Sequence, residues 1–232
     1  MLQPGCAESY NRLAMLLYYI TDRGGFAGND SDQRTALLRR IAEAAGAGVD
    51  YIQLREKDLD PADLELLARQ ALHVIRDNSA ATKLLINTHT DIALAVGADG
   101  VHLPADSPPA SQIRAQWLLR GDCEPLIGVS AHTVGEVRQA ERQGASFALL
   151  APIFEKAATR AKGIGLDVLR EACAGSRIPV LALGGVNLTN ARACLDAGAA
   201  GLAGIRLYQH GDVSRTVNTL REFTRQNLHA AN

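Results

Sequence analysis

The segment Gln53-Leu54-Arg55-Glu56-Lys57 places an amide, two cations and a carboxylate directly after an apolar stretch, residues 49–52. Unpaired charges are costly to bury, so these side chains are not expected to belong to a core. The apolar stretch is typical of a short buried strand, and parallel α/β proteins bind their ligands at the carboxyl ends of such strands. The segment is therefore a candidate for ligand binding. The alternative is an ordinary solvated turn between a strand and a helix.

Comparable polar residues follow the other apolar stretches of the chain. They are Thr21, Asp22 and Arg23; Asn87, Thr88 and His89; His102 and Asp106; Ser130 and His132; and a cationic loop that runs from Glu155 and Lys156 to Lys162. If the apolar stretches are parallel strands of one sheet, all of these residues lie at the same end of it. They are the candidate site residues.

Two glycine-containing stretches indicate an anion site. Gly184-Gly185 precedes a helix that the pattern starts at Asn187, and Gly204 and Arg206 follow the last apolar stretch. Glycines let a ligand approach the backbone closely, and the start of a helix favours negative charge. Barrels of alternating strands and helices commonly bind phosphate at this place in the chain. We therefore expect a phosphate site here, with a tight turn as the alternative.

A repeated phrase organises the chain. A Gly-Ala pair, then small or polar residues, then an apolar run begins at Gly46, Gly97, Gly144 and Gly198. The interval is about 50 residues, which marks alternate strand–helix units. Each glycine is expected to end a helix in the left-handed conformation, and each apolar run to start a buried strand.

The stretches between the repeats complete the pattern. Further strands are expected at residues 16–20, 83–87, 125–130 and 178–183, and helices at residues 31–45, 61–76, 91–96, 108–118, 134–143, 166–173, 188–197 and 213–226. Eight strands alternating with eight helices predict an α/β protein with a single (β/α)8 TIM barrel. We expect the barrel to span residues 15–232, after an N-terminal extension of residues 1–14.

Composition excludes several classes of function. The net charge of −1 gives no basic field to attract nucleic acid or an anionic membrane. No apolar run approaches the ~18 residues of a membrane span, and residues 1–13 lack the pattern of a secretory signal. The four cysteines form no C-x-x-C pair. We expect a cytoplasmic protein that acts on small molecules, with a homo-oligomer left open.

The chain resembles the thiamin phosphate synthase / thiazole tautomerase (TenI) superfamily from Tyr19 to Gly204. The motifs that carry the resemblance are Tyr-Ile-Thr-Asp, Gln-Leu-Arg-Glu-Lys, Gly-Ala-Asp-Gly-Val-His-Leu, Gly-Val-Ser-Ala-His-Thr, Pro-Ile-Phe and Ala-Leu-Gly-Gly-Val, in this order. The fold of that superfamily is a barrel of the kind counted above.

The resemblance to the synthases implies a role for each matching residue. Gln53, Arg55 and Lys57 match residues that hold the diphosphate of hydroxymethylpyrimidine diphosphate, and fixed cations suit a polyphosphate leaving group. The other matches are Asn87, which contacts substrate; Ser130, near the reacting centre; and Gly184 and Gly185, whose amides hold the thiazole phosphate. Gly204 and Arg206 complete this phosphate end.

The chain also departs from the synthase pattern. Thr88 stands where the synthases have a magnesium-linked Asp, and Ser107 stands where they have a second one. Asp106, one position earlier, is a metal ligand only if the protein is a synthase. Arg206 replaces a phosphate-binding Ser, and a Glu155-Lys156 loop replaces Thr-x-Thr-Lys, with Lys156 as its substrate-binding candidate.

These departures resemble the tautomerase branch, which needs no metal. The catalytic histidine of that branch falls on His132, and histidine suits general acid–base catalysis near neutral pH. We expect tautomerase chemistry on a thiazole phosphate, through His132 with Arg55 and Lys57. One alternative is a Mg²⁺-dependent synthase that couples hydroxymethylpyrimidine diphosphate to thiazole phosphate and releases pyrophosphate. Another is a non-catalytic barrel that binds thiamin phosphate for regulation.

Two polar residues have simpler interpretations. His102 lies inside an apolar stretch and is expected to be a hydrogen-bonded residue of the barrel. Glu56 is expected to orient Arg55 or Lys57 rather than to touch the substrate. The role of His89 stays open between lining the site and lining the start of a helix.

Overall fold

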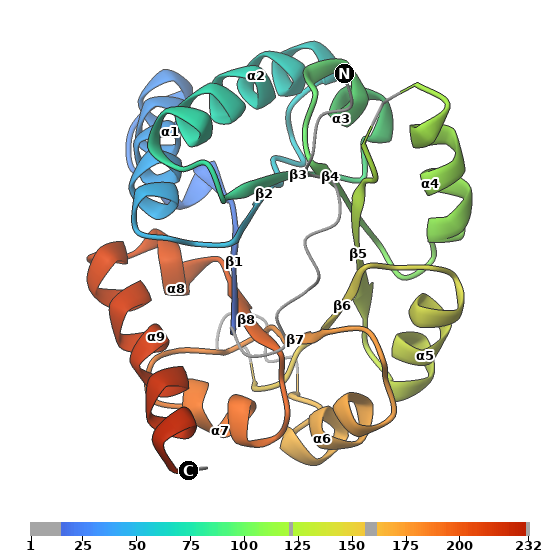
Figure 1. Cartoon of the computed structure of the whole chain (residues 1–232). Coiled ribbons are helices and arrows are strands. Elements are labelled where there is room, and N and C mark those ends of the chain that lie inside the picture. Colours follow the sequence, from blue (N-terminus) through green and yellow to red (C-terminus); the bar gives the residue numbers. More distant parts are fainter. Residues whose placement is uncertain (1–14, 121–122, 156–161, 231–232) are drawn as a thin grey trace, which may run out of the picture.

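The computed structural model describes residues 15–120, 123–155 and 162–230. Within them, parallel strands β1 to β8 form a closed barrel in which each strand pairs with the next and β8 pairs with β1. Figure 1 shows the strands as an inner ring and the helices as an outer one. The prediction of a (β/α)8 barrel is confirmed. The proposed extension, residues 1–14, and Lys156 lie outside the described residues.

The strands match the predicted apolar stretches to within a few residues. They are β1 (Leu16–Ile20), β2 (Tyr51–Leu54), β3 (Lys83–Asn87), β4 (Gly100–Leu103), β5 (Leu126–Ala131), β6 (Phe147–Leu150), β7 (Val180–Ala182) and β8 (Gly201–Gly204). The helices are the short 3-10 turn η1 (Arg23–Gly25), α1 (Asp30–Gly46), α2 (Pro61–Asn78), α3 (Thr90–Val96), α4 (Ala110–Leu118), α5 (Val134–Arg142), α6 (Leu166–Ala174), α7 (Ala191–Asp196), α8 (Arg206–Gln209) and α9 (Val213–Ala230).

The repeated glycines end helices as expected, with one correction. Gly97, Gly144 and Gly198 have φ values of 70°, 86° and 96°, which lie in the left-handed region. In the first repeat, however, Gly46 is still helical, and Gly48 takes the left-handed conformation with φ of 90°. The second glycine of that repeat therefore ends the turn.

Two predictions near the end of the chain were wrong in detail. The helix expected from residue 188 begins only at Ala191, and residues 188–190 form a turn before it. The side chain of Asn187 accepts hydrogen bonds from the N–H groups of Thr189 and Asn190, which is the bonding of a helix N-cap, so Asn187 marks the start of this turn. The four-residue helix α8, directly after β8, was not predicted at all.

Successive side chains of each strand point to opposite sides, and this creates two separate hydrophobic cores. Residues that point into the barrel, among them Tyr18, Tyr51 and Phe147, form one buried cluster. Their strand neighbours, such as Leu17 and Ile52, pack outward against the helices in a second cluster. Since successive side chains of a strand point to opposite sides, every second residue faces the barrel interior. This parity decides which side chains reach the mouth.

Candidate active site at the barrel mouth

Gln53 is the buried polar residue of β2 at the top of the barrel interior. It follows the inward-facing Tyr51 by two residues and lies in register between Ile20 of β1 and Leu85 of β3. Its amide lies near the Tyr18 hydroxyl, but Nε2 has no hydrogen-bond partner within the described residues. Because buried amides are normally satisfied, this orphan donor is suited to a ligand above it.

Arg55 and Lys57 extend the same edge of the barrel. Arg55 has the inward parity of Tyr51 and Gln53 and is half-buried, whereas Lys57 is exposed. Neither side chain makes a hydrogen bond or an ion pair with a described residue. Two cations held close together without carboxylate partners are available to an anionic ligand.

Glu56 points away from these two cations. Its carboxylate accepts a hydrogen bond from Thr21 Oγ1 at 2.5 Å and others from Arg23, through the backbone N–H at 3.0 Å and Nη1 at 3.4 Å. Burial raises the pKa of Glu56, and the bonds from Thr21 and Arg23 oppose that rise. Glu56 makes no direct contact with Arg55 or Lys57 among these bonds, so any orienting effect on them acts through Thr21 and Arg23.

The β3 end presents Asn87 beside a conformationally unusual residue. Asn87 is half-buried, lies in register with His102, and donates from Nδ2 to Thr88 Oγ1 at 3.0 Å. Thr88 has φ of 68°, and such a conformation is strained for a β-branched residue. His89 is exposed at the start of α3, where its side chain makes no capping hydrogen bond.

His102 and Ser130 form a buried polar chain with Tyr18. His102 Nδ1 lies 3.2 Å from the Tyr18 hydroxyl and Nε2 lies 2.9 Å from Ser130 Oγ. Gly128 makes room for this ring, since a Cβ there would lie 2.8 Å from Nδ1. Burial, together with the nearby charge of Arg55, lowers the pKa of His102 to about 3. The prediction of a hydrogen-bonded barrel histidine is confirmed.

His132 lies exposed just beyond β5. Its Nδ1 lies 2.8 Å from the carbonyl oxygen of Ala151, and its backbone N–H donates to Glu136 Oε2 at 2.7 Å. A carbonyl only accepts hydrogen bonds, so Nδ1 carries the proton in the neutral ring. Nε2 then has a free lone pair, which is the form of histidine that can take up a proton.

The ends of β7 and β8 form the second polar region of the mouth. Gly184 and Gly185 have φ values of 93° and 70°, and a Cβ on them would lie 2.6 Å from Pro152 Cα and 2.7 Å from Phe154 Cβ, respectively. The carbonyl of Gly184 accepts from the N–H of Phe154, whereas neither glycine N–H donates to another backbone group of the described residues. Glycine is required here by both conformation and space.

The unpredicted helix α8 directly follows β8, which pairs with β7. Its Gln209 accepts a hydrogen bond from the Tyr19 hydroxyl and donates one to the Asp22 carbonyl, so α8 packs on the β1 side of β8. Barrels commonly complete a phosphate site with a short extra helix after the eighth strand. Arg206 is the first residue of α8 and is exposed, and its side chain has no carboxylate partner in the described part of the chain. Gly204 ends β8 directly before this turn.

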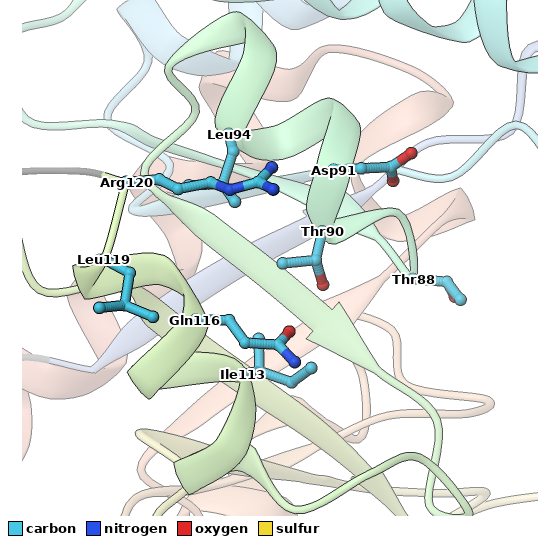
Figure 2. Close-up of a pocket in the computed structure, with 8 residues that line it drawn as sticks. All are labelled: Thr88, Thr90, Asp91, Leu94, Ile113, Gln116, Leu119 and Arg120. Atoms are coloured by element: carbon cyan, nitrogen blue, oxygen red, sulfur yellow. The ribbon is translucent and has the colours of Figure 1, made fainter.

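An open groove of about 550 Å³ lies outside the barrel, between α3 and α4 (Figure 2). Thr90, Asp91 and Leu94 of α3 form one side, and residues of α4 and the turn after it form the other. Thr88 borders this groove at the end of β3. None of the other residues described above lines it, so it is separate from the barrel mouth.

Comparisons with known proteins agree with this architecture. The sequence profile of the family described as thiamine monophosphate synthase matches residues 17–207. The chain belongs to the thiamine monophosphate synthase family. It is 39% identical over 191 residues to the thiamine-phosphate synthase of Moorella thermoacetica, covering 80% of this chain and 87% of that protein. It is 35% identical over 217 residues to the thiamine-phosphate synthase of Caldanaerobacter subterraneus, covering 92% and 96%.

A solved structure extends the agreement to three dimensions. The thiamine phosphate pyrophosphorylase from Pyrococcus furiosus superposes with a TM-score of 0.77 at 28% identity, covering 94% of this chain and 98% of that one. Among the described helices of this thiamine monophosphate synthase family member, none combines the length and apolar character needed to cross a bilayer.

The structure gathers most predicted site residues at one end of the barrel and adds others. Gln53, Arg55, Asn87 and Ser130 share the inward parity of their strands. Sequence reasoning missed Tyr18, which supports His102. Tyr18 lies two residues from both Leu16 and Ile20, which also face the barrel interior. Nothing in the sequence, however, indicated the hydrogen bond between Tyr18 and His102.

Proposed function

We propose that this protein is a thiamin phosphate synthase, which joins hydroxymethylpyrimidine diphosphate to thiazole phosphate and releases pyrophosphate. The observation that carries the proposal is the presence, at one barrel mouth, of two separate sets of groups that are suited to bind anions. One consists of Gln53, Arg55 and Lys57 after β2, and the other of Gly184 and Gly185 after β7.

The two regions lie in different sectors of the mouth. In the closed barrel, β8 and β1 stand between β7 and β2. An isomerase that acts on one thiazole carboxylate phosphate needs a single phosphate site. A coupling enzyme needs two, since both of its substrates carry phosphate, and their organic ends must meet between the two sites.

In the coupling step, the thiazole nitrogen forms a bond to the methylene carbon of the pyrimidine while the bond from that carbon to the diphosphate oxygen breaks. Negative charge then grows on the leaving pyrophosphate. Arg55 and Lys57, which have no competing carboxylate partner within the described residues, are suited to stabilise that charge. The orphan Nε2 of Gln53 and the hydroxyl of Ser130 are suited to orient the pyrimidine.

A synthase of this kind implies magnesium. The described residues contain no group of three or more His, Cys, Asp or Glu side chains that could hold a metal ion. Magnesium bound by substrate phosphates needs only one or two protein carboxylates, however. Asp106, which is exposed and has no hydrogen bond to another described residue, fits such a minimal set. When bound, the ion would neutralise part of the charge on the diphosphate.

Product analysis tests the proposal. Purified protein is mixed with both substrates and magnesium, and the products are identified by mass spectrometry. We expect thiamin phosphate and pyrophosphate in equal amounts, and a loss of both products in the Arg55→Ala variant. If the intact protein forms neither product while it binds both substrates, the synthase proposal is wrong and a binding role replaces it.

One observation favours the tautomerase as a second candidate. His132 holds its Nδ1 proton against the Ala151 carbonyl, which leaves Nε2 as a base at the mouth. Such a base could move a proton between the two tautomers of a thiazole carboxylate phosphate. Conversion of that compound without the pyrimidine substrate, and its loss in His132→Gln, would support this activity. Coupling that persists in His132→Gln would assign His132 no role in the synthase reaction.

A further inference from the structure

We propose that Thr21, Glu56 and Arg23 are positioning residues, which hold the segment from Arg55 to Lys57 so that its two cations face the diphosphate. This inference rests on the proposed function, because it concerns the same anion-binding region. It assigns a role to three buried polar residues.

Thr21 links the Glu56 carboxylate to the backbone of Arg55. Its Oγ1 donates to Glu56 Oε1 at 2.5 Å and accepts from the backbone N–H of Arg55 at 2.9 Å. A hydroxyl has one proton, so its bond to the carboxylate fixes which lone pairs face the Arg55 amide. Thr21 is fully buried, and its own backbone N–H donates to the Gln53 carbonyl at 3.0 Å. The backbone on both sides of Leu54 is thus hydrogen-bonded to Thr21, the residue that follows β1.

Arg23 holds the far side of the segment. It donates to Glu56 from its backbone N–H and Nη1, and to Asp58 through both Nη1 and Nη2, at 2.6 and 2.8 Å. Its Nε donates to Asp30 of α1 at 3.0 Å. Glu56 and Asp58 flank Lys57 in the sequence, so one arginine fixes the backbone before and after that lysine.

The arrangement also decides which charges stay free. Glu56 and Asp58 are the carboxylates nearest in sequence to Lys57, and either would otherwise compete with a phosphate for Arg55 or Lys57. Arg23 binds both carboxylates, and it lowers the pKa of Asp58 through its hydrogen bonds. The Arg23–Asp58 pair is bidentate and therefore has a fixed geometry, and Glu56 is held by the Arg23 backbone N–H and Nη1, so both carboxylates already have a cationic partner.

Isosteric substitution of Thr21 tests the positioning role. Thr21→Val keeps the side-chain shape but removes the hydroxyl, and Thr21→Ser restores the hydroxyl. The matched control is Thr82→Val, because Thr82 is also a buried threonine whose Oγ1 donates a hydrogen bond, to the Val49 carbonyl at 2.7 Å. Thr82 directly precedes β3, at the end of the barrel opposite the mouth.

The measured quantity is the affinity for inorganic pyrophosphate by calorimetry, in magnesium-containing buffer, with thermal unfolding recorded for each variant. We expect Thr21→Val to bind pyrophosphate about tenfold more weakly, which corresponds to one lost oriented hydrogen bond. Thr21→Ser and Thr82→Val are expected to bind it as the unsubstituted protein does. Folded Thr21→Val protein with unchanged affinity would overturn the inference.

Glu56→Gln provides a second test, because the direction of the change in pyrophosphate affinity separates two explanations. Glutamine keeps the volume and removes a negative charge close to the anion site. If Glu56 acted through its charge alone, pyrophosphate would bind more tightly, which would overturn the inference. A positioning role predicts weaker binding, because Arg23 loses a carboxylate partner. Arg55→Ala separates this inference from the proposed function: if that variant also binds pyrophosphate normally, the anion site itself has been misassigned.

Discussion

His102 Nε2 lies 2.9 Å from Ser130 Oγ, and this hydrogen bond joins the closed interior of the barrel to its mouth. The other ring nitrogen lies 3.2 Å from the Tyr18 hydroxyl, so both nitrogens have partners. A neutral imidazole can satisfy both bonds, as a donor at one nitrogen and an acceptor at the other. The orientation of Ser130 therefore depends on a histidine that remains uncharged.

The buried His102 predicts a pH dependence of stability. Its pKa is about 3 in the folded protein, below the ordinary value of about 6.5. Between these values the unfolded chain binds a proton that the folded protein does not, so this contribution to stability is complete above pH 6.5 and is lost as the pH falls towards 3. We expect the unfolding free energy of the unsubstituted protein, minus that of His102→Gln, to fall by up to about 1.4 kcal/mol per pH unit below pH 6.

Urea unfolding between pH 4 and pH 7 measures this difference. The matched control is His73→Gln, because the side chain of His73 is 76% exposed on α2. Because His73 is not buried, the control variant is expected to lack the fall predicted for His102→Gln. A constant difference for His102→Gln would show that His102 is not held neutral by burial.

Arg55 and Lys57, which have no ion-pair partner in the described part of the chain, predict a selective kinetic defect. Arg55→Ala or Lys57→Ala is expected to lower kcat/KM for the pyrimidine diphosphate by about 10²-fold, because each removes a charge from the leaving group. Lys83→Ala is the control, since Lys83 lies at the opposite end of β3 and pairs with Asp99 at 3.2 Å. Steady-state kinetics with the thiazole phosphate saturating separates the variants. An equal effect of all three substitutions would point to net charge alone.

The phosphate end predicts a defect for the other substrate. Gly185→Ala places a Cβ 2.7 Å from Phe154 Cβ on a backbone with φ of 70°, so the turn must shift. We expect KM for thiazole phosphate to rise at least about tenfold, with a stability cost of about 1–3 kcal/mol.

Gly211→Ala isolates the conformational cost from the loss of the site. Gly211 has φ of 67° but nothing within 4 Å of an added Cβ, and it lies between α8 and α9. It is expected to lose stability without a change in KM. A Gly185→Ala enzyme with unchanged KM for thiazole phosphate would remove the phosphate assignment from this turn.

Arg221 lies at the end of the barrel opposite the mouth, so its replacement is expected to lower stability without affecting catalysis. Arg221 of α9 donates to the carbonyls of Met15 and Gly48 and pairs with Asp50 at 2.7 Å, while Asp50 also accepts from the N–H of Leu17. Arg221→Ala is expected to cost about 1–3 kcal/mol of unfolding free energy with kcat and KM unchanged. Arg39→Ala, whose side chain is 77% exposed, should change stability by less than about 0.5 kcal/mol. A change in KM in Arg221→Ala would show that the two faces are coupled.

Local patterns explain why most of the fold could be predicted. Asp60-Pro61 begins α2 as expected, with the Asp60 carboxylate capping the N–H of Asp63, and Gly97 ends α3 in the left-handed conformation. These signals involve residues a few positions apart. The existence of α8 escaped prediction because this four-residue helix is too short to show a periodic pattern, and its Gln209 bonds to Tyr19 and Asp22, which lie far away in the sequence.

The residues of the candidate site could be predicted from the sequence, but their hydrogen-bond partners could not. Glu56 was expected to orient Arg55 or Lys57, but the sequence named no partner for its carboxylate. In the structure it accepts hydrogen bonds from Thr21 and Arg23, 35 and 33 residues away. The strand pairing of β1 with β2, which the sequence does not encode locally, brings these residues together.

The sequence by itself determined the alternation of strands and helices and the end of the barrel at which polar residues gather. These follow from apolar runs and from glycines that end helices, and both are local properties of the chain. Only the closed barrel decided which groups share a hydrogen bond. Tyr18 and His102 are 84 residues apart, and they meet because ring closure brings strands together across a common interior.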